Sequence, residues 1–264
     1  VNMISNKSIT ANFIAVPPPV ALGTIANFGA YGGSAGITNQ GVFTVINNGA
    51  IGTTAAPTLI TGFHDGVTGT PYTETSLNIG DVVDGIFTAP PAPGTTASFT
   101  TATNALNDAN TAYLSISPAS KPGGTDPGAG ELGGLTLAPG IYKSSIATFK
   151  ITNQDLILDA QGDPNAYWIF QMSAGLTVGT PAGVRSVVLR DGAQAKNVFW
   201  YVGSSAVINY AGGGTMVGTI IATAGVTLSS PASSTKSSPL TTLNGRAISL
   251  VASVTMVNTV INNQ

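Results

Sequence analysis

Charged residues are scarce in this chain: Asp, Glu, Lys and Arg make up 8% of its 264 residues, against roughly 25% in an average soluble domain. The net charge at pH 7 is −2, so the clustered Lys and Arg of a nucleic-acid or anionic-membrane surface are missing. Cysteine is absent, which excludes disulfides and thiolate metal sites. His64 is the only histidine, so a zinc site or a His-based triad has a single candidate. No run of about 18 apolar residues occurs, and no transmembrane helix is predicted.

Small neutral residues take the place of the missing charge. The chain has 33 Gly, 16 Pro and 43% hydrophobic residues, and roughly one residue in eight is threonine, well above average usage. This hydrophobic content argues against a disordered chain. The length suits one large all-β domain or two small ones and is sufficient for a sizeable core.

One segment has a helical pattern, and the rest of the chain does not. Residues 1–20 are predicted to form an irregular arm, and residues 21–90 contain short apolar runs between glycines, typical of short strands. Residues 97–115 are predicted to form an amphipathic helix, capped by Thr96 or Ser98. Its expected packing stripe is Phe99, Thr103, Leu106, Asn110 and Tyr113, with Ala102, Ala105, Ala109 and Ala112 alongside.

Residues 131–264 carry short apolar triplets in sets of two or three, with about 20 to 30 residues per set. Gly, Asn, Ser or Pro separates the triplets. This density and period favour a β-solenoid, in which each strand stacks on its counterpart in the next coil about 4.8 Å away. Inward residues would then form aliphatic ladders, and outward residues would form flat arrays.

Several longer motifs occur in a consistent order from about residue 20 to residue 264. They are Val20–Phe28 (VALGTIANF), Leu59–Phe63 (LITGF), Leu132–Lys143 (LGGLTLAPGIYK), Tyr167–Gln171 (YWIFQ), Asp191–Trp200 (DGAQAKNVFW) and Leu243–Arg246 (LNGR). Together they resemble the microbial ice-binding (antifreeze) protein family of cold-adapted bacteria, fungi and algae. The sequence departs from the family in a longer loop at 232–242 and in Lys150, where a small residue would be expected.

The resemblance implies one ice-binding domain over residues 1–264. Its fold would be all-β with one long helix: an irregular right-handed β-solenoid of triangular cross-section, with the helix packed alongside and the main coils at 131–264. It also implies a secreted protein that binds the ice crystal surface. The sequence opens without a signal-peptide pattern, so we expect any such peptide to have been removed. We expect a monomer without cofactor, metal, nucleic-acid or membrane partners. The region 64–95 is predicted to cap one end of the solenoid, and the tail Val260–Gln264 the other.

The resemblance places the ice-binding face on one strand of each coil, and strand alternation puts the middle residue of each triplet outward. The predicted ice-binding residues are Thr38, Thr152, Thr177, Val207, Thr227, Ser229 and Thr255, with Lys150 as a charged misfit. A threonine offers a hydroxyl that can join a water lattice and a methyl beside it, and β-branching keeps its χ1 angle stiff. Threonine is also an ordinary exposed strand residue, so these positions are open to a purely structural interpretation.

Two other functions fit a solenoid. Parallel β-helices include polysaccharide-cleaving enzymes, which need carboxylates converging on a groove, but many acids here lie beside Gly, Pro or Asn, where Asp forms turns. We therefore expect no catalytic site. A secreted adhesion or carbohydrate-binding module remains an alternative. Such a module would present grooves with aromatics and carboxylates, where an ice-binding protein would present a flat uncharged face.

Overall fold

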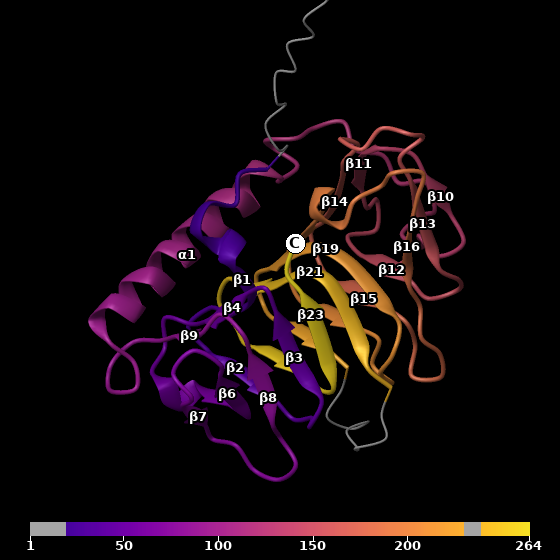
Figure 1. Cartoon of the computed structure of the whole chain (residues 1–264). Coiled ribbons are helices and arrows are strands. Elements are labelled where there is room, and N and C mark those ends of the chain that lie inside the picture. Colours follow the sequence, from indigo (N-terminus) through magenta and orange to yellow (C-terminus); the bar gives the residue numbers. More distant parts are fainter. Residues whose placement is uncertain (1–19, 230–238) are drawn as a thin grey trace, which may run out of the picture.

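Short strands stacked in parallel dominate the fold. The computed structural model describes residues 20–229 and 239–264, and within them the strands form a large sheet, a seven-stranded sheet and a three-stranded sheet (Figure 1). These sheets are the sides of the predicted irregular β-solenoid. The predicted arm at 1–20 lies outside the described residues except for its last residue, as does most of the loop at 232–242.

The large sheet contains thirteen strands of the described chain. In sheet order, its main path is β11 (Gly140–Lys143), β14 (Trp168–Met172), β17 (Val198–Val202), β19 (Thr215–Ala222), β21 (Thr241–Ser249), β23 (Thr259–Asn262), β3 (Thr44–Asn47), β8 (Gly80–Val82), β6 (Phe63–Asp65) and β7 (Pro71–Tyr72). A branch from β21 runs through β1 (Phe28–Gly32), β4 (Ala50–Gly52) and β9 (Ile86–Phe87).

The seven-stranded sheet forms another side of the solenoid, and the three-stranded sheet lies beside the first part of β19. The seven-stranded sheet runs β12 (Phe149–Ile151), β15 (Leu176–Val178), β18 (Ala206–Ile208), β20 (Val226–Leu228), β22 (Val254–Met256), β2 (Ile37–Asn39) and β5 (Ile60–Thr61). The three-stranded sheet runs β10 (Thr136–Leu137), β13 (Leu156–Asp159) and β16 (Val187–Arg190). Three short 3₁₀ helices lie at η1 (Gly23–Asn27), η2 (Pro57–Leu59) and η3 (Ala195–Asn197).

Segments far apart in the sequence are neighbours in these sheets. Strand β2 pairs with β22, β3 pairs with β23, and β1 pairs with β21, all in parallel. The N-terminal coils therefore continue the stack that the C-terminal coils begin. The prediction that Val260–Gln264 blunts an end is wrong, because β23 lies between β21 and β3 in the middle of the large sheet. Strands β7, β8 and β9, from the region 64–95, lie toward one end of the stack, and β11 lies at the other.

The single α-helix of the described residues, α1 (Thr96–Ser115), confirms the helix predicted over 97–115. Its cap is Thr95, whose side chain accepts a hydrogen bond from the Ser98 N–H, so the expected cap at Thr96 or Ser98 is wrong by one to three residues. Tyr113 is buried and stacks on Tyr201 with ring centroids 4.1 Å apart.

The packing stripe of the helix also differs from the prediction. The four alanines Ala102, Ala105, Ala109 and Ala112 are fully buried against large-sheet side chains that include Ile169, Phe199, Ile221 and Ile248. Phe99 is 38% exposed, so its expected role in attaching the helix is wrong. Small side chains let the helix backbone approach the sheet closely enough for the Tyr31 hydroxyl to donate to the Ala102 carbonyl at 2.7 Å.

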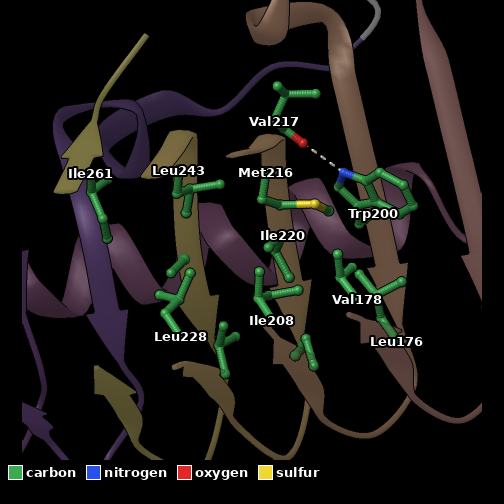
Figure 2. Close-up of a cluster of buried hydrophobic side chains, with 14 of the residues drawn as sticks. Leu176, Val178, Trp200, Ile208, Met216, Val217, Ile220, Leu228, Leu243 and Ile261 are labelled. Carbon is green, nitrogen blue, oxygen red and sulfur yellow. Dashed lines mark hydrogen bonds between the residues drawn. The ribbon is translucent and has the colours of Figure 1, made fainter. Parts of the chain in front are cut away.

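The core fills the space between the large and the seven-stranded sheets. Figure 2 shows Leu176, Ile208 and Leu228 of the seven-stranded sheet pointing toward Ile220 and Leu243 of the large sheet. Trp168 and Trp200 are fully buried, and each indole N–H donates to a backbone carbonyl. This packing of aliphatic and aromatic side chains makes the outer surface of each sheet a rigid support.

Candidate binding face

The outward residues of the seven-stranded sheet fall into one row. The backbone register places Thr177 beside Val207, Val207 beside Thr227, and Thr227 beside Thr255. The row continues from Thr255 to Thr38 and from Thr38 to Thr61. We call these six residues, one from each of β15, β18, β20, β22, β2 and β5, the threonine row. Five of the seven predicted residues are thus brought together.

The threonine row is held in place by the residues on either side of each member. Val226 and Leu228 flank Thr227, and both are buried. In the next coil, Val254 and Met256 flank Thr255 in the same way. Because each outward residue is anchored by two core side chains, the row is straight, with neighbours separated by the strand spacing of about 4.8 Å.

Lys150 lies on the outward side of β12, in register with Thr177. Strand β12 is the edge strand of the seven-stranded sheet, so the ammonium group stands at one end of the row and does not interrupt it. Lys150 also pairs through its backbone with Glu131, a residue of the loop that covers this edge. The charged misfit therefore marks the boundary of the uncharged surface.

Thr152 is not part of the row. Strand β12 ends at Ile151, and the Thr152 hydroxyl donates to Glu131 Oε2 while its N–H donates to Glu131 Oε1 at 2.9 Å. The prediction of an outward position in the row for Thr152 is wrong, because the strand alternation on which it rests stops one residue earlier. These two hydrogen bonds attach the loop that contains Glu131 to the end of β12.

Ser229 is also misplaced by the prediction. Its backbone has a φ of +60°, so the chain turns a corner directly after Leu228 instead of continuing as a strand. The side chain is 1% exposed, and its hydroxyl lies 2.8 Å from Thr241 Oγ1. The same corner has positive φ at Gly179 and Asn209, which follow β15 and β18 directly. Ser229 therefore belongs to a buried corner and not to the outer face.

Sequence reasoning missed a second row beside the first. Each strand of the face is preceded by a turn, and a small residue stands three positions before the outward residue of each of five coils. These residues, which we call the small-residue row, are Ala35, Ala174, Ser204, Ala224 and Ala252. Successive turns are bonded through their backbones, for example Ser204 N–H to Ala174 O at 3.1 Å and Ala224 N–H to Ser204 O at 2.9 Å.

The signal for this second row was present in the sequence as a repeated spacing, Ala-x-x-Thr, at 35–38, 174–177, 224–227 and 252–255. Thr61, which completes the threonine row, was missed because its strand has only two residues. We call the two rows together the threonine face. The threonine row spans six strands, and the small-residue row stands in the turns that precede five of them. The corner that contains Ser229 lies on the other side of the threonine row.

The threonine face carries no ionisable side chain in either row. All six members of the threonine row are β-branched threonine or valine, and the small residues beside them add little bulk. Partly buried hydrogen bonds fix the corner that follows β18: Asn209 donates to the Arg185 carbonyl and accepts from the Arg185 N–H, both at 3.0 Å. A rigid, flat and neutral surface of this kind can order neighbouring water without competing ionic hydration shells.

Groups that could perform catalysis do not converge on this face. His64, the single candidate for a zinc site or a His-based triad, lies in β6 with Nδ1 3.5 Å from Glu74 Oε2. Within residues 20–229 and 239–264, no cluster of three or more His, Cys, Asp or Glu residues has the geometry of a metal site. Across the same residues, no helix is long and apolar enough to cross a membrane.

Comparison with known proteins connects this architecture to one family. A family model described as Ice-binding-like matches residues 31–262. Ice-binding protein K1-A of Typhula ishikariensis is 32% identical over 204 residues, which is 76% of each chain. An ice-binding protein of a Colwellia species is 31% identical over 262 residues, covering 96% of this chain and 95% of the relative.

Solved structures agree with the sequence comparison. The ice-binding protein 1 domain of Shewanella frigidimarina matches with a TM-score of 0.74 at 25% identity, covering 92% of this chain and 96% of that one. A glycosylated ice-binding protein from an Arctic yeast also gives a TM-score of 0.74, at 27% identity, with 93% and 94% coverage. With its fold and most of its length matched in this way, the chain belongs to the ice-binding-like family.

Proposed function

We propose that this protein adsorbs to ice crystals through the threonine face. The observation that carries the proposal is the uninterrupted register from Thr177 to Thr61, which lines up six uncharged outward residues at the strand spacing. Ice is a neutral lattice, and the strand spacing of about 4.8 Å is close to one of its repeats. Relatives of this chain are named as ice-binding proteins.

The physical mechanism needs no chemical step. Threonine hydroxyls and methyls hold water in lattice-like positions, and stiff β-branched side chains lose little rotamer freedom on contact. Each contact is weak, but a rigid flat array makes many contacts at once, so adsorption becomes effectively irreversible. Adsorbed molecules then pin the crystal surface, which produces thermal hysteresis and inhibits recrystallisation. We further propose that the protein acts as a secreted monomer.

A single ice crystal in a nanolitre osmometer tests the proposal. We expect the purified protein to open a gap between melting and growth temperatures and to shape the crystal into facets. A crystal that grows smoothly just below the melting point, without gap or facets, would overturn the proposal. The heat-unfolded protein at the same concentration is the control, because it keeps the colligative contribution and loses the face.

Carbohydrate binding is a second candidate function, favoured by one observation. A hollow of about 860 Å³ beside η3 is lined by Tyr167, Asn165, Gln194 and Lys196, among others. An aromatic side chain beside amides is a combination that suits sugars. Titration with soluble oligosaccharides, monitored by chemical shifts of these residues, distinguishes the two functions. Binding there without any hysteresis gap would favour the carbohydrate module.

A further inference from the structure

A second ordered surface adjoins the threonine face on the same coils. On the large sheet, Asn244 of β21, Asn262 of β23 and Asn47 of β3 are in register and face outward. Their side chains form a ladder: Asn47 Nδ2 donates to Asn262 Oδ1 at 3.0 Å, and Asn262 Nδ2 donates to Asn244 Oδ1 at 2.9 Å. All three are partly exposed, so the ladder lies at the surface.

A row of β-branched residues runs parallel to this ladder. Thr242, Val260 and Val45 stand two positions before the three asparagines, in register with one another. Residues two apart in a strand are separated by roughly 6.6 Å, and neighbouring strands by about 4.8 Å. The inward residues between the two rows, Leu243, Ile261 and Ile46, are fully buried. We call these two rows on β21, β23 and β3 the amide face.

The amide face is rigid for reasons that the structure shows directly. A carboxamide has two N–H donors and an acceptor oxygen with two lone pairs, and the ladder uses one donor and one lone pair of Asn262. The remaining N–H donor and oxygen lone pair of Asn262 are held in a fixed orientation, because each amide along the ladder donates in the same direction. The neighbouring β-branched side chains have restricted χ1 angles. Water beside this surface therefore meets a repeating, immobile set of polar and methyl groups.

The amide face is also continuous with the threonine face. Strand β22, which carries Thr255, leads through a two-residue corner into β23, and β2, which carries Thr38, leads through a four-residue turn into β3. Asn258 stiffens this corner, because its Oδ1 accepts from the Val42 N–H at 3.1 Å. The uncharged strip ends at β8, where Asp81 pairs with Val45.

Two glycines separate the amide face from the part of the large sheet that α1 covers. Gly218 and Gly245 are paired in register and both have positive φ, +97° and +151°. A Cβ at Gly245 would lie 2.0 Å from the Gly218 carbonyl oxygen, so the two long strands can bend here only with glycine. Beyond the bend, Ile221 and Ile248 pack under the helix, which lies along that part of the sheet (Figure 1). Before it, Thr242 and Asn244 of β21 are partly exposed, whereas Val217 of β19 is buried.

We propose that the amide face is a second ice-contacting surface, which engages crystal planes that the threonine face does not. The inference rests on the proposed function, because it assumes that the protein binds ice at all. A surface of three strands makes fewer contacts than one of six, so its contribution is the smaller one. Its orientation differs from that of the threonine face, so it meets ice planes of a different orientation.

Ice-plane affinity of fluorescently labelled protein on a single-crystal ice hemisphere tests the inference. The set is the unmodified protein, Thr227→Tyr on the threonine face, Val260→Tyr on the amide face, the double variant, and Asn107→Tyr on the exposed side of α1 as control. We expect Thr227→Tyr and Val260→Tyr to lose different sets of stained planes, the double variant to lose all of them, and Asn107→Tyr to lose none.

The outcomes separate this inference from the proposed function. If the unmodified protein stains no plane, the proposed function fails and this inference fails with it. If the unmodified protein stains ice but Val260→Tyr leaves the pattern unchanged, alone and combined with Thr227→Tyr, only the second surface is overturned. Circular dichroism confirms folding of each variant. Should Val260→Tyr misfold, Asn262→Asp, which has the same shape but adds a charge to the ladder, replaces it with the same expected and contrary outcomes.

Discussion

The seven-stranded and three-stranded sheets are built from the same coils yet present different surfaces. The threonine row contains no charge between Thr177 and Thr61, whereas the three-stranded sheet exposes Val188 at 42% and places Arg190 Nη1 3.7 Å from Asp159 Oδ2. Both sheets are parallel and both bury alternate residues in the core. The comparison teaches that the stacking gives flatness to every face, while the outward residues decide whether a face remains neutral over many strands.

The outward residues of both sheets are supported by buried side chains on either side of them. Truncation of one such buried side chain is the change with the largest expected effect on stability. Leu228→Ala deletes a fully buried side chain directly beside Thr227, and we expect the free energy of unfolding to fall by about 2–5 kcal/mol. Chemical denaturation measures the change. Thr227→Ala, one residue away on the outside, is the control and should change stability by only about 0.5 kcal/mol. Equal losses for the two variants would contradict the inward and outward assignment.

Position along the threonine row sharpens the comparison further. Thr61→Tyr changes the last member of the row, on the edge strand β5, where a protruding ring lifts only one end of the face from the lattice. We expect thermal hysteresis to fall by roughly half, less than for a tyrosine at Thr227, because an edge contact has one neighbour in the row and not two. Nanolitre osmometry at matched concentration measures it. A complete loss for Thr61→Tyr would show that the row does not act as an array.

Lys150 offers the opposite change, a gain. Lys150→Thr removes the one charge in register with Thr177 and lengthens the uncharged row by one strand. We expect a modest increase in hysteresis, in proportion to the one strand that is added to the face. The free energy of unfolding should change by no more than about 0.5 kcal/mol. Arg190→Thr on the three-stranded sheet is the matched control and should leave hysteresis unchanged. An equal gain for both variants would point to net charge and not to the face.

The smallest expected effect concerns the loop that closes the β11 and β12 end of the stack. Partial burial alone would raise the pKa of Asp126, but hydrogen bonds from Ser145, Gly130 and Gly128 outweigh it and hold the pKa below its ordinary value. A carboxyl whose folded-state pKa is lowered stabilises the fold above its unfolded pKa of about 3.9 and loses this contribution as pH falls through the folded value.

Denaturation of the unmodified protein and of Asp126→Asn between pH 6 and pH 2 measures this contribution. We expect the unmodified protein to be the more stable of the two at pH 6 and the difference to shrink as the pH falls. A difference that stays constant over this range would show that the charge of Asp126 contributes nothing to the loop.

The sequence predicted the solenoid, the helix and most of the threonine row, because alternation within a three-residue strand needs only local information. It failed where the chain leaves the strand. Ser229 and Thr152 follow the alternating pattern in the sequence, but a corner with positive φ and an early strand end direct their side chains elsewhere.

Coil order was equally hidden from the sequence. Nothing local to Val260–Gln264 shows that β3 stacks on β23, because that pairing joins residues more than 200 positions apart. The amide ladder escaped prediction for the same reason, since Asn47, Asn244 and Asn262 become neighbours only when N-terminal and C-terminal coils interleave. The prediction for Phe99 was wrong for a different reason. The helix packs on the sheet through its four buried alanines, which allow a close approach, and Phe99 remains partly exposed.

The central claim, that ice is contacted through the threonine row, is tested most directly by one paired measurement of thermal hysteresis. Thr227→Tyr and Val188→Tyr place the same ring on the outside of two different sheets, each at a position whose change should cost no more than about 0.5 kcal/mol of stability. At matched concentration, with folding confirmed by circular dichroism, we expect hysteresis of Thr227→Tyr to fall to roughly a tenth of its original value, because the ring lifts the neighbouring residues of a rigid row away from the ice, and that of Val188→Tyr to remain unchanged. Full activity of Thr227→Tyr together with loss in Val188→Tyr would contradict the account and assign ice contact to the three-stranded sheet.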